Sequence, residues 1–345
     1  MTVATRDRLA RLGWDAGWAS ELKHLDGPEL RPGRVGTEHR GAYVLLTEDG
    51  EQWAVPTGRL RLEHREGRGD LPAVGDWVAY TLPESSDRAV VSAVLPRRTA
   101  ISRKTALNET KEQVLAANVD LVFLTTAIPD DLNLRRLERY LATAWESGAR
   151  PVIVLTKADL ADDVDAAVAS VEGIAAGVPV HAVAVLVGKG LDELRAHLDG
   201  NPTIVLLGSS GVGKSTIVNA LLGTDTIETQ EIRKDGRGRH TTTRRELFLL
   251  PDGGIVIDTP GIRELQLWDA GEGLDEAFED VETFAERCRF SDCSHEHEPG
   301  CAVRAAIEAG ELPAERLASY LKLQRELETL EARQTALLRA QRRRR

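Results

Sequence analysis

A glycine-rich loop in the middle of the chain has residue types and a spacing that suit phosphate binding. Its sequence, GSSGVGKST, matches G-x-x-x-x-G-K-S and stands between an apolar run and a helix-forming run. In such a loop the backbone N–H groups surround phosphate oxygens, the lysine neutralises them and the serine hydroxyl binds magnesium. The residues expected to bind phosphate, with Ser215 also a magnesium ligand, are Gly208, Ser209, Ser210, Gly211, Val212, Gly213, Lys214, Ser215 and Thr216.

A second motif, TKAD, predicts which base the nucleotide carries. The carboxylate of Asp159 can accept two hydrogen bonds from the donors on the edge of guanine, a pair that adenine does not offer. Lys157 is expected to lie along the plane of the base. Thr156 stands where most GTPases carry asparagine, a change expected to weaken the hold on the loop beneath the base. The loop at 184–189 is a less specific candidate for a further base contact.

A third motif, DTPG, predicts the remaining contacts to metal and phosphate. Asp258 is expected to hold magnesium through water, and the Gly261 N–H to sense the γ-phosphate. Many GTPases follow this glycine with a glutamine that positions the attacking water, but here Ile262 follows. Hydrolysis must therefore use another group or stay slow until a partner arrives. Because TKAD precedes the phosphate loop, whereas ordinary GTPase domains have the reverse order, the motifs indicate a circularly permuted GTPase.

The three cysteines of the chain all fall between positions 288 and 301, in the pattern C-x4-C-x-H-x5-C. Three thiolates and one imidazole complete a tetrahedral zinc shell, and a shell with no open position is structural. The predicted ligands are Cys288, Cys293, His295 and Cys301, with Asp292 and His297 as competing choices. An odd number of clustered cysteines argues against a disulfide framework.

Apolar runs must position the nucleotide motifs. The runs 152–155, 203–207 and 255–257 each lead directly into one motif, within a region from about 113 to 272 where apolar strands alternate with helical segments. That alternation is typical of a parallel sheet covered by helices, whose ligands bind beyond the carboxyl ends of the strands. The three motifs are therefore expected to converge on one crevice.

Short β-like runs between residues 33 and 96 alternate with Gly, Asp and Pro. They predict about five antiparallel strands that close into a small barrel, for which we prefer an OB-fold to an SH3-like barrel. Arg59, Arg61 and Arg65 are expected near strand ends, where they could contact an RNA backbone. The alternative is a barrel that only braces its neighbour.

Composition narrows the class of protein further. The net charge of −11 over 345 residues excludes a basic particle that coats nucleic acid by bulk attraction, so a basic surface must be local, as in 233–245 or 342–345. There is no apolar run of about 18 residues, and the first residues carry charges where a signal peptide needs apolar side chains. We expect a soluble, cytoplasmic monomer that does not bind membranes.

Taken together and in their order along the chain, these motifs make the sequence resemble the ribosome small-subunit-dependent GTPases, which act in late assembly of the small ribosomal particle. The resemblance covers most of the chain: GDWV, ANVD, TKAD, GSSGVGKST, GRGRHTTT, DTPG and the cysteine cluster. It implies an OB-fold barrel, a permuted GTPase domain and a small helical zinc domain. It also implies magnesium-dependent hydrolysis of GTP to GDP, stimulated by the small ribosomal subunit through contact with its rRNA.

The resemblance further implies that His240 positions the attacking water and that Thr242, among 241–243, contacts magnesium. A solvent-facing His240 in a basic RNA-contacting loop is the alternative. The expected domains are an N-terminal extension at 1–32, the barrel at 33–100, the permuted GTPase domain at 101–272, and a zinc-binding domain with a C-terminal helix and basic tail at 273–345. Two other functions stay open. One is a nucleotide-regulated RNA-binding assembly chaperone with negligible turnover. The other is a phosphate-loop kinase or ATPase, although Asp159 and the permuted order of the motifs argue against it.

Overall fold

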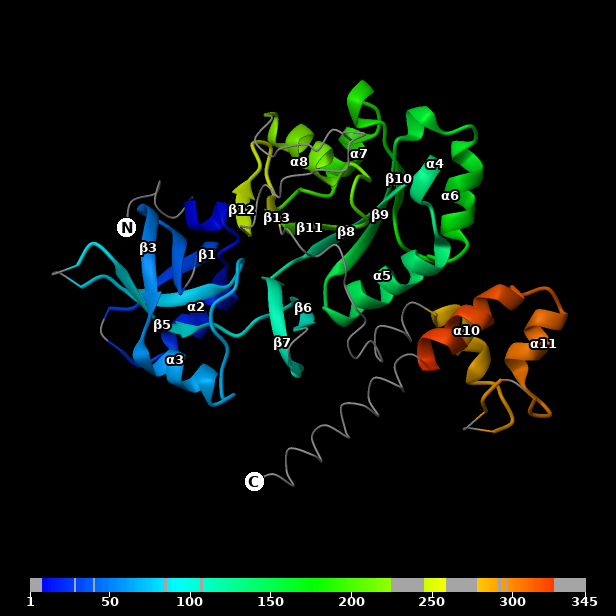
Figure 1. Ribbon diagram of the computed structural model, residues 1–345, viewed down its shortest axis with the longest axis horizontal. Helices are drawn as coiled ribbons and strands as arrows, with labels where there is room; N and C mark the ends of the chain where they lie inside the picture. Colours follow the sequence, from blue (N-terminus) through cyan, green and yellow to red (C-terminus); the bar gives the residue numbers. More distant parts are fainter. Residues whose placement is uncertain are drawn as a thin grey trace.

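The computed structural model describes residues 8–27, 29–39, 41–83, 86–105, 108–224, 245–258, 278–290, 293–295 and 297–325, and of 103–105 and 108–112 the backbone alone. The predicted site residues His240, Thr242 and Gly261 lie outside these ranges, as do the competing ligand Asp292 and the C-terminal arginines. The described part forms a barrel, a larger sheet covered by helices and a group of C-terminal helices (Figure 1).

Five strands close the barrel in the order of an OB-fold. They are β1 (Arg31–His39), β2 (Ala42–Thr47), β3 (Gly50–Pro56), β4 (Trp77–Thr81) and β5 (Ala89–Val94). The order is β1-β2-β3-β5-β4, and β4 pairs again with β1, so no strand edge is left open. This order decides for the OB-fold over the SH3-like barrel.

Helix α3 (Gly58–Arg65) follows β3 and corrects one expectation. The Thr57 side chain accepts a hydrogen bond from the Leu60 N–H, which caps the first turn of this helix. Arg59, Arg61 and Arg65 therefore lie on a helix and not at strand ends. The alternation of leucine and arginine at 59–62 imitates a strand, and the capping threonine before it was the contrary signal.

The N-terminal extension packs against the barrel. Helix α2 (Ala16–Lys23) is capped by Asp15, whose side chain accepts from the Trp18 N–H. Arg98 forms two hydrogen bonds with Asp15, and these lower the pKa of Asp15 to about 2. The apolar contact is one buried cluster of Leu9, Leu12, Trp18, Trp77 and Leu95. Burial of these side chains fixes the extension at the start of the barrel.

The nucleotide-binding motifs stand on a parallel sheet with helices on both faces. Its strands β8 (Leu121–Ala127), β9 (Arg150–Thr156), β10 (Val180–Ala182), β11 (Thr203–Leu207) and β13 (Ile255–Asp258) lie in the order β10-β9-β8-β11-β13. The short α4 (Ile128–Asp131) follows β8, and the longer helices are α5 (Leu134–Glu146), α6 (Val164–Glu172), α7 (Leu191–Ala196) and α8 (Lys214–Leu222). Alternate residues of β8 pack into two different cores, Val122 with Leu137 of α5 and Phe123 with Ile217 of α8. The strands predicted at 152–155, 203–207 and 255–257 are confirmed as β9, β11 and β13.

Three strands were not predicted. β6 (Ala100–Thr105) and β7 (Asn108–Ala117) form a separate antiparallel pair. β12 (Glu246–Leu249) pairs antiparallel with β13 on one side and with barrel strand β1 on the other. The barrel and the nucleotide-binding sheet are thereby joined into one sheet of eleven strands.

The C-terminal part comprises α10 (Glu279–Ala285), α11 (Ala302–Glu308) and a helix over 314–325. Their buried side chains belong to the same core cluster as those of α5, and they include Phe278, Val281, Val303, Leu317 and Tyr320. The C-terminal helix expected from the sequence is described over 314–325. None of the helices described is long and apolar enough to span a bilayer.

Candidate nucleotide site and metal centre

Three motifs come together at one edge of the parallel sheet. Thr156 ends β9, Gly208 follows β11 and Asp258 ends β13, and these strands lie within four neighbouring positions, β9-β8-β11-β13. Because the strands are parallel, their carboxyl ends all meet at this edge. The convergence expected from the sequence is present although the first residues of the three motifs are 50 positions apart or more.

The phosphate loop has a shape that only glycine permits at its first position. Gly208 has φ 151°, and a Cβ there would lie 2.0 Å from the Thr125 carbonyl oxygen of β8. The Lys214 Nζ lies within the loop and donates to the carbonyls of Gly208 and Ser209 at 2.7 and 2.6 Å. Helix α8 begins at Lys214, so the N-terminal dipole of α8 and the lysine both favour an anion here. Ser215, the predicted magnesium ligand, is in the first turn of α8.

The threonine of TKAD connects the base motif to the phosphate loop. Its buried hydroxyl lies 2.5 Å from the Val212 carbonyl oxygen and 3.3 Å from that of Thr126. From the sequence we expected threonine at this position to hold the loop beneath the base less well than asparagine does. In the structure the Thr156 hydroxyl donates directly to a carbonyl of the phosphate loop.

Replacing Thr156 by valine is expected to weaken GTP binding by roughly tenfold, or about 1.4 kcal/mol, because the buried Val212 carbonyl loses its donor. Valine keeps the shape of threonine, so the sheet should remain folded. The measurement is the Kd for GTP and GDP by calorimetry. Thr143→Val is the matched control, since the Thr143 hydroxyl donates only within α5, to the Arg139 carbonyl.

The base motif lies beside the loop that the sequence assigned least firmly. Lys157 has φ 55° and begins the 3-10 turn η1 (Ala158–Leu160), which leaves the Asp159 side chain exposed for a ligand. The Ala158 N–H donates to the Val183 carbonyl at 3.2 Å, and Ala184 and Lys189 exchange backbone hydrogen bonds across the turn η2 (Val185–Val187). The loop at 184–189 is thus placed next to TKAD, as a guanine contact requires.

Sequence reasoning missed a pair of histidines that connects the two sides of this loop. His181 of β10 and His197 after α7 have their Nε2 atoms 2.8 Å apart, at hydrogen-bonding distance. Burial lowers the pKa of both rings, and at His197 the positive charges of His181 and Arg150 add to this, whereas Glu193 acts in the opposite direction on His181. The two histidines are 16 residues apart in the chain, and neither belongs to a recognisable motif.

This histidine pair predicts a pH dependence. Since the folded state favours neutral rings, its contribution to stability is full above the unfolded histidine pKa of about 6.5 and is lost as pH falls below that value. Melting temperature and GDP affinity should therefore fall between pH 7.5 and 5.5. The fall should be steeper in the wild type than in His181→Gln/His197→Gln, whose amides keep a hydrogen bond but do not titrate. Parallel curves for the two proteins would contradict this.

The four predicted zinc ligands form one cluster. Their ligand atoms all lie within 4.8 Å of one another. The Cys288 and Cys301 sulfurs are 3.9 Å apart, and the His295 Nδ1 is 3.6 and 3.5 Å from them. A tetrahedral zinc with bonds of about 2.3 Å to sulfur and 2.0 Å to nitrogen requires roughly 3.8 Å between two sulfurs and roughly 3.5 Å between sulfur and nitrogen. The donor set and its spacing therefore fit one metal ion, while His297 is exposed and outside the cluster.

Comparisons with known proteins agree with this architecture. The model of the family described as RsgA GTPase matches residues 94–268. A small ribosomal subunit biogenesis GTPase RsgA of Opitutus terrae is 49% identical over 92% of this chain and 89% of that protein, and one of Streptomyces avermitilis is 46% identical over 97% and 90%. The crystal structure of YjeQ from Thermotoga maritima has a TM-score of 0.66 at 29% identity, covering 86% of this chain and 98% of YjeQ.

A second solved structure supports the topology. YloQ, a circularly permuted GTPase, has a TM-score of 0.62 at 24% identity and covers 89% of this chain and 98% of its own, which shows a common fold. The match to the Streptomyces avermitilis protein covers 97% of this chain, so it includes the barrel, the nucleotide motifs and the cysteine cluster. This chain belongs to the RsgA GTPase family.

Proposed function

We propose that this protein hydrolyses GTP to GDP and phosphate and acts in biogenesis of the small ribosomal subunit, which stimulates the hydrolysis. The observation that carries the proposal is the meeting of a guanine motif, a phosphate loop and Asp258 at one sheet edge. The names of the relatives, small ribosomal subunit biogenesis GTPases, supply the partner. Asp159 would select guanine, since its exposed carboxylate can accept both donors of the base edge.

Magnesium would be held by Ser215 and Asp258, with Thr242 as the third contact taken from the resemblance. The two described residues fit this role because Asp258 ends β13 and Ser215 is in the first turn of α8, directly after the loop that follows the adjacent strand β11, so their oxygen atoms could hold the ion beside bound phosphates. When bound, magnesium would neutralise charge that develops on the phosphates. His240 is proposed to orient the attacking water, because Ile262 stands where many GTPases have glutamine and cannot do so.

Zinc is the metal proposed for the cysteine cluster, and its role is structural because all four positions are filled by protein ligands.

The barrel is proposed to contact rRNA. Trp53 of β3 is half exposed, and its ring centroid is 4.7 Å from that of His39, so an aromatic surface is available to a base. Arg59 and Arg61 on the nearby α3 would meet the phosphate backbone.

The test is GTP hydrolysis by the purified protein, alone and with isolated small ribosomal subunits, with ATP as the control nucleotide. We expect turnover that requires GTP and rises strongly with the subunit. His240→Ala should lose the stimulated turnover and keep GTP binding, whereas the control His297→Ala should keep both. Binding of GTP without any stimulation would instead favour a nucleotide-regulated RNA-binding chaperone.

A further inference from the structure

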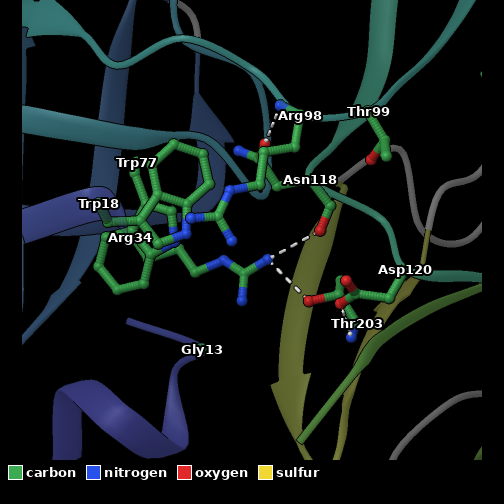
Figure 2. A pocket seen from close by; sticks show the side chains of 9 residues that line it. All are labelled: Gly13, Trp18, Arg34, Trp77, Arg98, Thr99, Asn118, Asp120 and Thr203. Atoms are coloured by element: carbon green, nitrogen blue, oxygen red, sulfur yellow. Dashed lines mark hydrogen bonds between the residues drawn. The ribbon is translucent and has the colours of Figure 1, made fainter. Parts of the chain in front are cut away.

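Barrel strand β1 touches the nucleotide-binding sheet at two places, and the first is fixed. Figure 2 shows Arg34 of β1 in the pocket between the barrel, the N-terminal extension and β11. Arg34 is 2% exposed, and its guanidinium donates to the carbonyls of Leu12, Gly75 and Asn118. It also donates, at 2.8 Å, to the hydroxyl of Thr203, the first residue of β11. Desolvation lowers the pKa of Arg34 to about 10, so it stays charged at neutral pH.

The motifs GDWV and ANVD build the rest of this joint. Gly75 has φ 93°, and a Cβ there would lie 2.1 Å from the Ala117 carbonyl, so the two segments meet backbone to backbone. Asn118 donates to the Gly75 carbonyl and accepts from the Arg98 N–H, and Asp120 accepts from the Thr203 N–H at 2.7 Å. Because Arg34, Asn118 and Thr203 are buried and hydrogen-bonded, the start of β1 is held firmly against the strand that leads to the phosphate loop.

The second contact of β1 leads to the predicted magnesium ligand. Thr37 of β1 pairs with Glu246 of β12, and Glu246 pairs with Asp258 of β13. This row of three residues crosses from the barrel to the strand end that carries Asp258. Beside it, Arg245 forms an ion pair with Glu38 at 3.2 Å and donates to the Val114 carbonyl of β7. Arg245 is 13% exposed and Glu38 39%, so this end of β1 is more open to water than the Arg34 joint.

We propose that β1 acts as a lever between the barrel and the magnesium site, with the Arg34 joint as its pivot and the Glu38–Arg245 pair as its coupling to Asp258. Glu38 is four positions after Arg34, about 13 Å along the strand. A small rotation of the barrel about the joint therefore moves the Thr37 end most. Because β12 is bonded on both sides, such a movement is passed to Asp258 through backbone pairing.

The proposal gives Glu38 and Arg245 a role in transmitting stimulation and none in the basal hydrolysis itself. It rests on the proposed function, since it explains how a partner bound to the barrel would reach the metal site. Among the described residues, β1 and β12 pair at one position, Thr37 with Glu246, so the ion pair beside it holds the register of the two strands. Without the ion pair, the barrel could move while β12 and β13 stay in place. Stimulation would then be lost although each part remained folded.

The experiment compares Glu38→Gln with Glu51→Gln, which removes an exposed carboxylate from β3 of the same barrel. We expect the stimulated kcat of Glu38→Gln to fall about fivefold or more, in the range of ordinary coupling between sites. Turnover without subunits, the Kd for GTP and the melting temperature should stay as in the wild type. Removing a negative charge cannot weaken attraction to rRNA, so affinity for the small subunit should be equal or higher. Glu51→Gln should behave as wild type.

A charge-exchanged variant separates coupling from a general defect. Glu38→Arg/Arg245→Glu restores an ion pair of opposite orientation and should recover at least part of the stimulation. Full stimulation in Glu38→Gln would overturn the lever, and so would a loss of subunit binding or of folding that the exchanged pair does not repair. If the wild type itself shows no stimulation, the proposed function fails first, and that result is visible before any variant is made.

Discussion

Arg316→Met is expected to destabilise the packing of the C-terminal helices by about 3–5 kcal/mol, because it leaves a buried carboxylate without its partner. Arg316, 5% exposed, donates at 2.9 Å to Glu138 of α5, whose side chain is 4% exposed. The same guanidinium makes two hydrogen bonds to Asp280 of α10 and lies 4.1 Å from the Phe278 ring centroid. One side chain thus joins the C-terminal helices to the nucleotide-binding sheet.

Methionine keeps most of the volume of arginine, so the loss should come from the lone charge of Glu138 and not from a cavity. Glu138→Met/Arg316→Met removes both charges and should recover most of the lost stability, as buried pairs replaced by apolar residues commonly do. Urea unfolding of the two variants and the wild type measures both the free energy lost in Arg316→Met and the part recovered in the double variant. A loss below about 1 kcal/mol in Arg316→Met, typical of an exposed pair, would contradict this account.

The parts of the fold that sequence predicts best are those set by local pattern. The runs of valine, isoleucine and leucine before TKAD, the phosphate loop and DTPG identify buried parallel strands, because both faces of such strands are covered. The three motifs and the cysteine spacing are local too, since each is contained within a few residues. Their convergence follows from the general geometry of parallel sheets.

The parts that sequence does not predict depend on contacts between distant residues. Glu138 and Arg316 are 178 positions apart, and Arg34 and Thr203 are 169 positions apart, so no local pattern connects them. Strand β12 has four residues, and its place depends on the barrel strand beside it. The two histidines at 181 and 197 meet because β10 and α7 fold around the loop between them.

Removing the metal is expected to have the largest effect of any change considered, since structural zinc contributes about 10–16 kcal/mol of apparent binding free energy in small zinc modules. Here the ligands hold together the segment between α10 and α11, from Cys288 to Cys301, and Cys288 also accepts a hydrogen bond from the Ala302 N–H that begins α11. Chelation at neutral pH should therefore unfold the C-terminal helices. GTP binding should persist, because the phosphate loop is supported by β8, β11 and α8.

The two histidines of this segment provide a matched pair of variants for the same claim. His295→Ala removes a ligand and should abolish stoichiometric zinc, measured by metal analysis after gel filtration, together with the helical signal of the C-terminal part. His297→Ala should retain one zinc per chain, because His297 is exposed and outside the cluster. Arg316→Met should also retain its zinc, since it loosens the helices from α5 without touching a ligand. Loss of zinc in Arg316→Met would mean that metal binding and the packing of the C-terminal helices on α5 form one cooperative unit. That result would contradict the present account, in which the zinc ligands and the Arg316–Glu138 contact lie in separate layers of the C-terminal part.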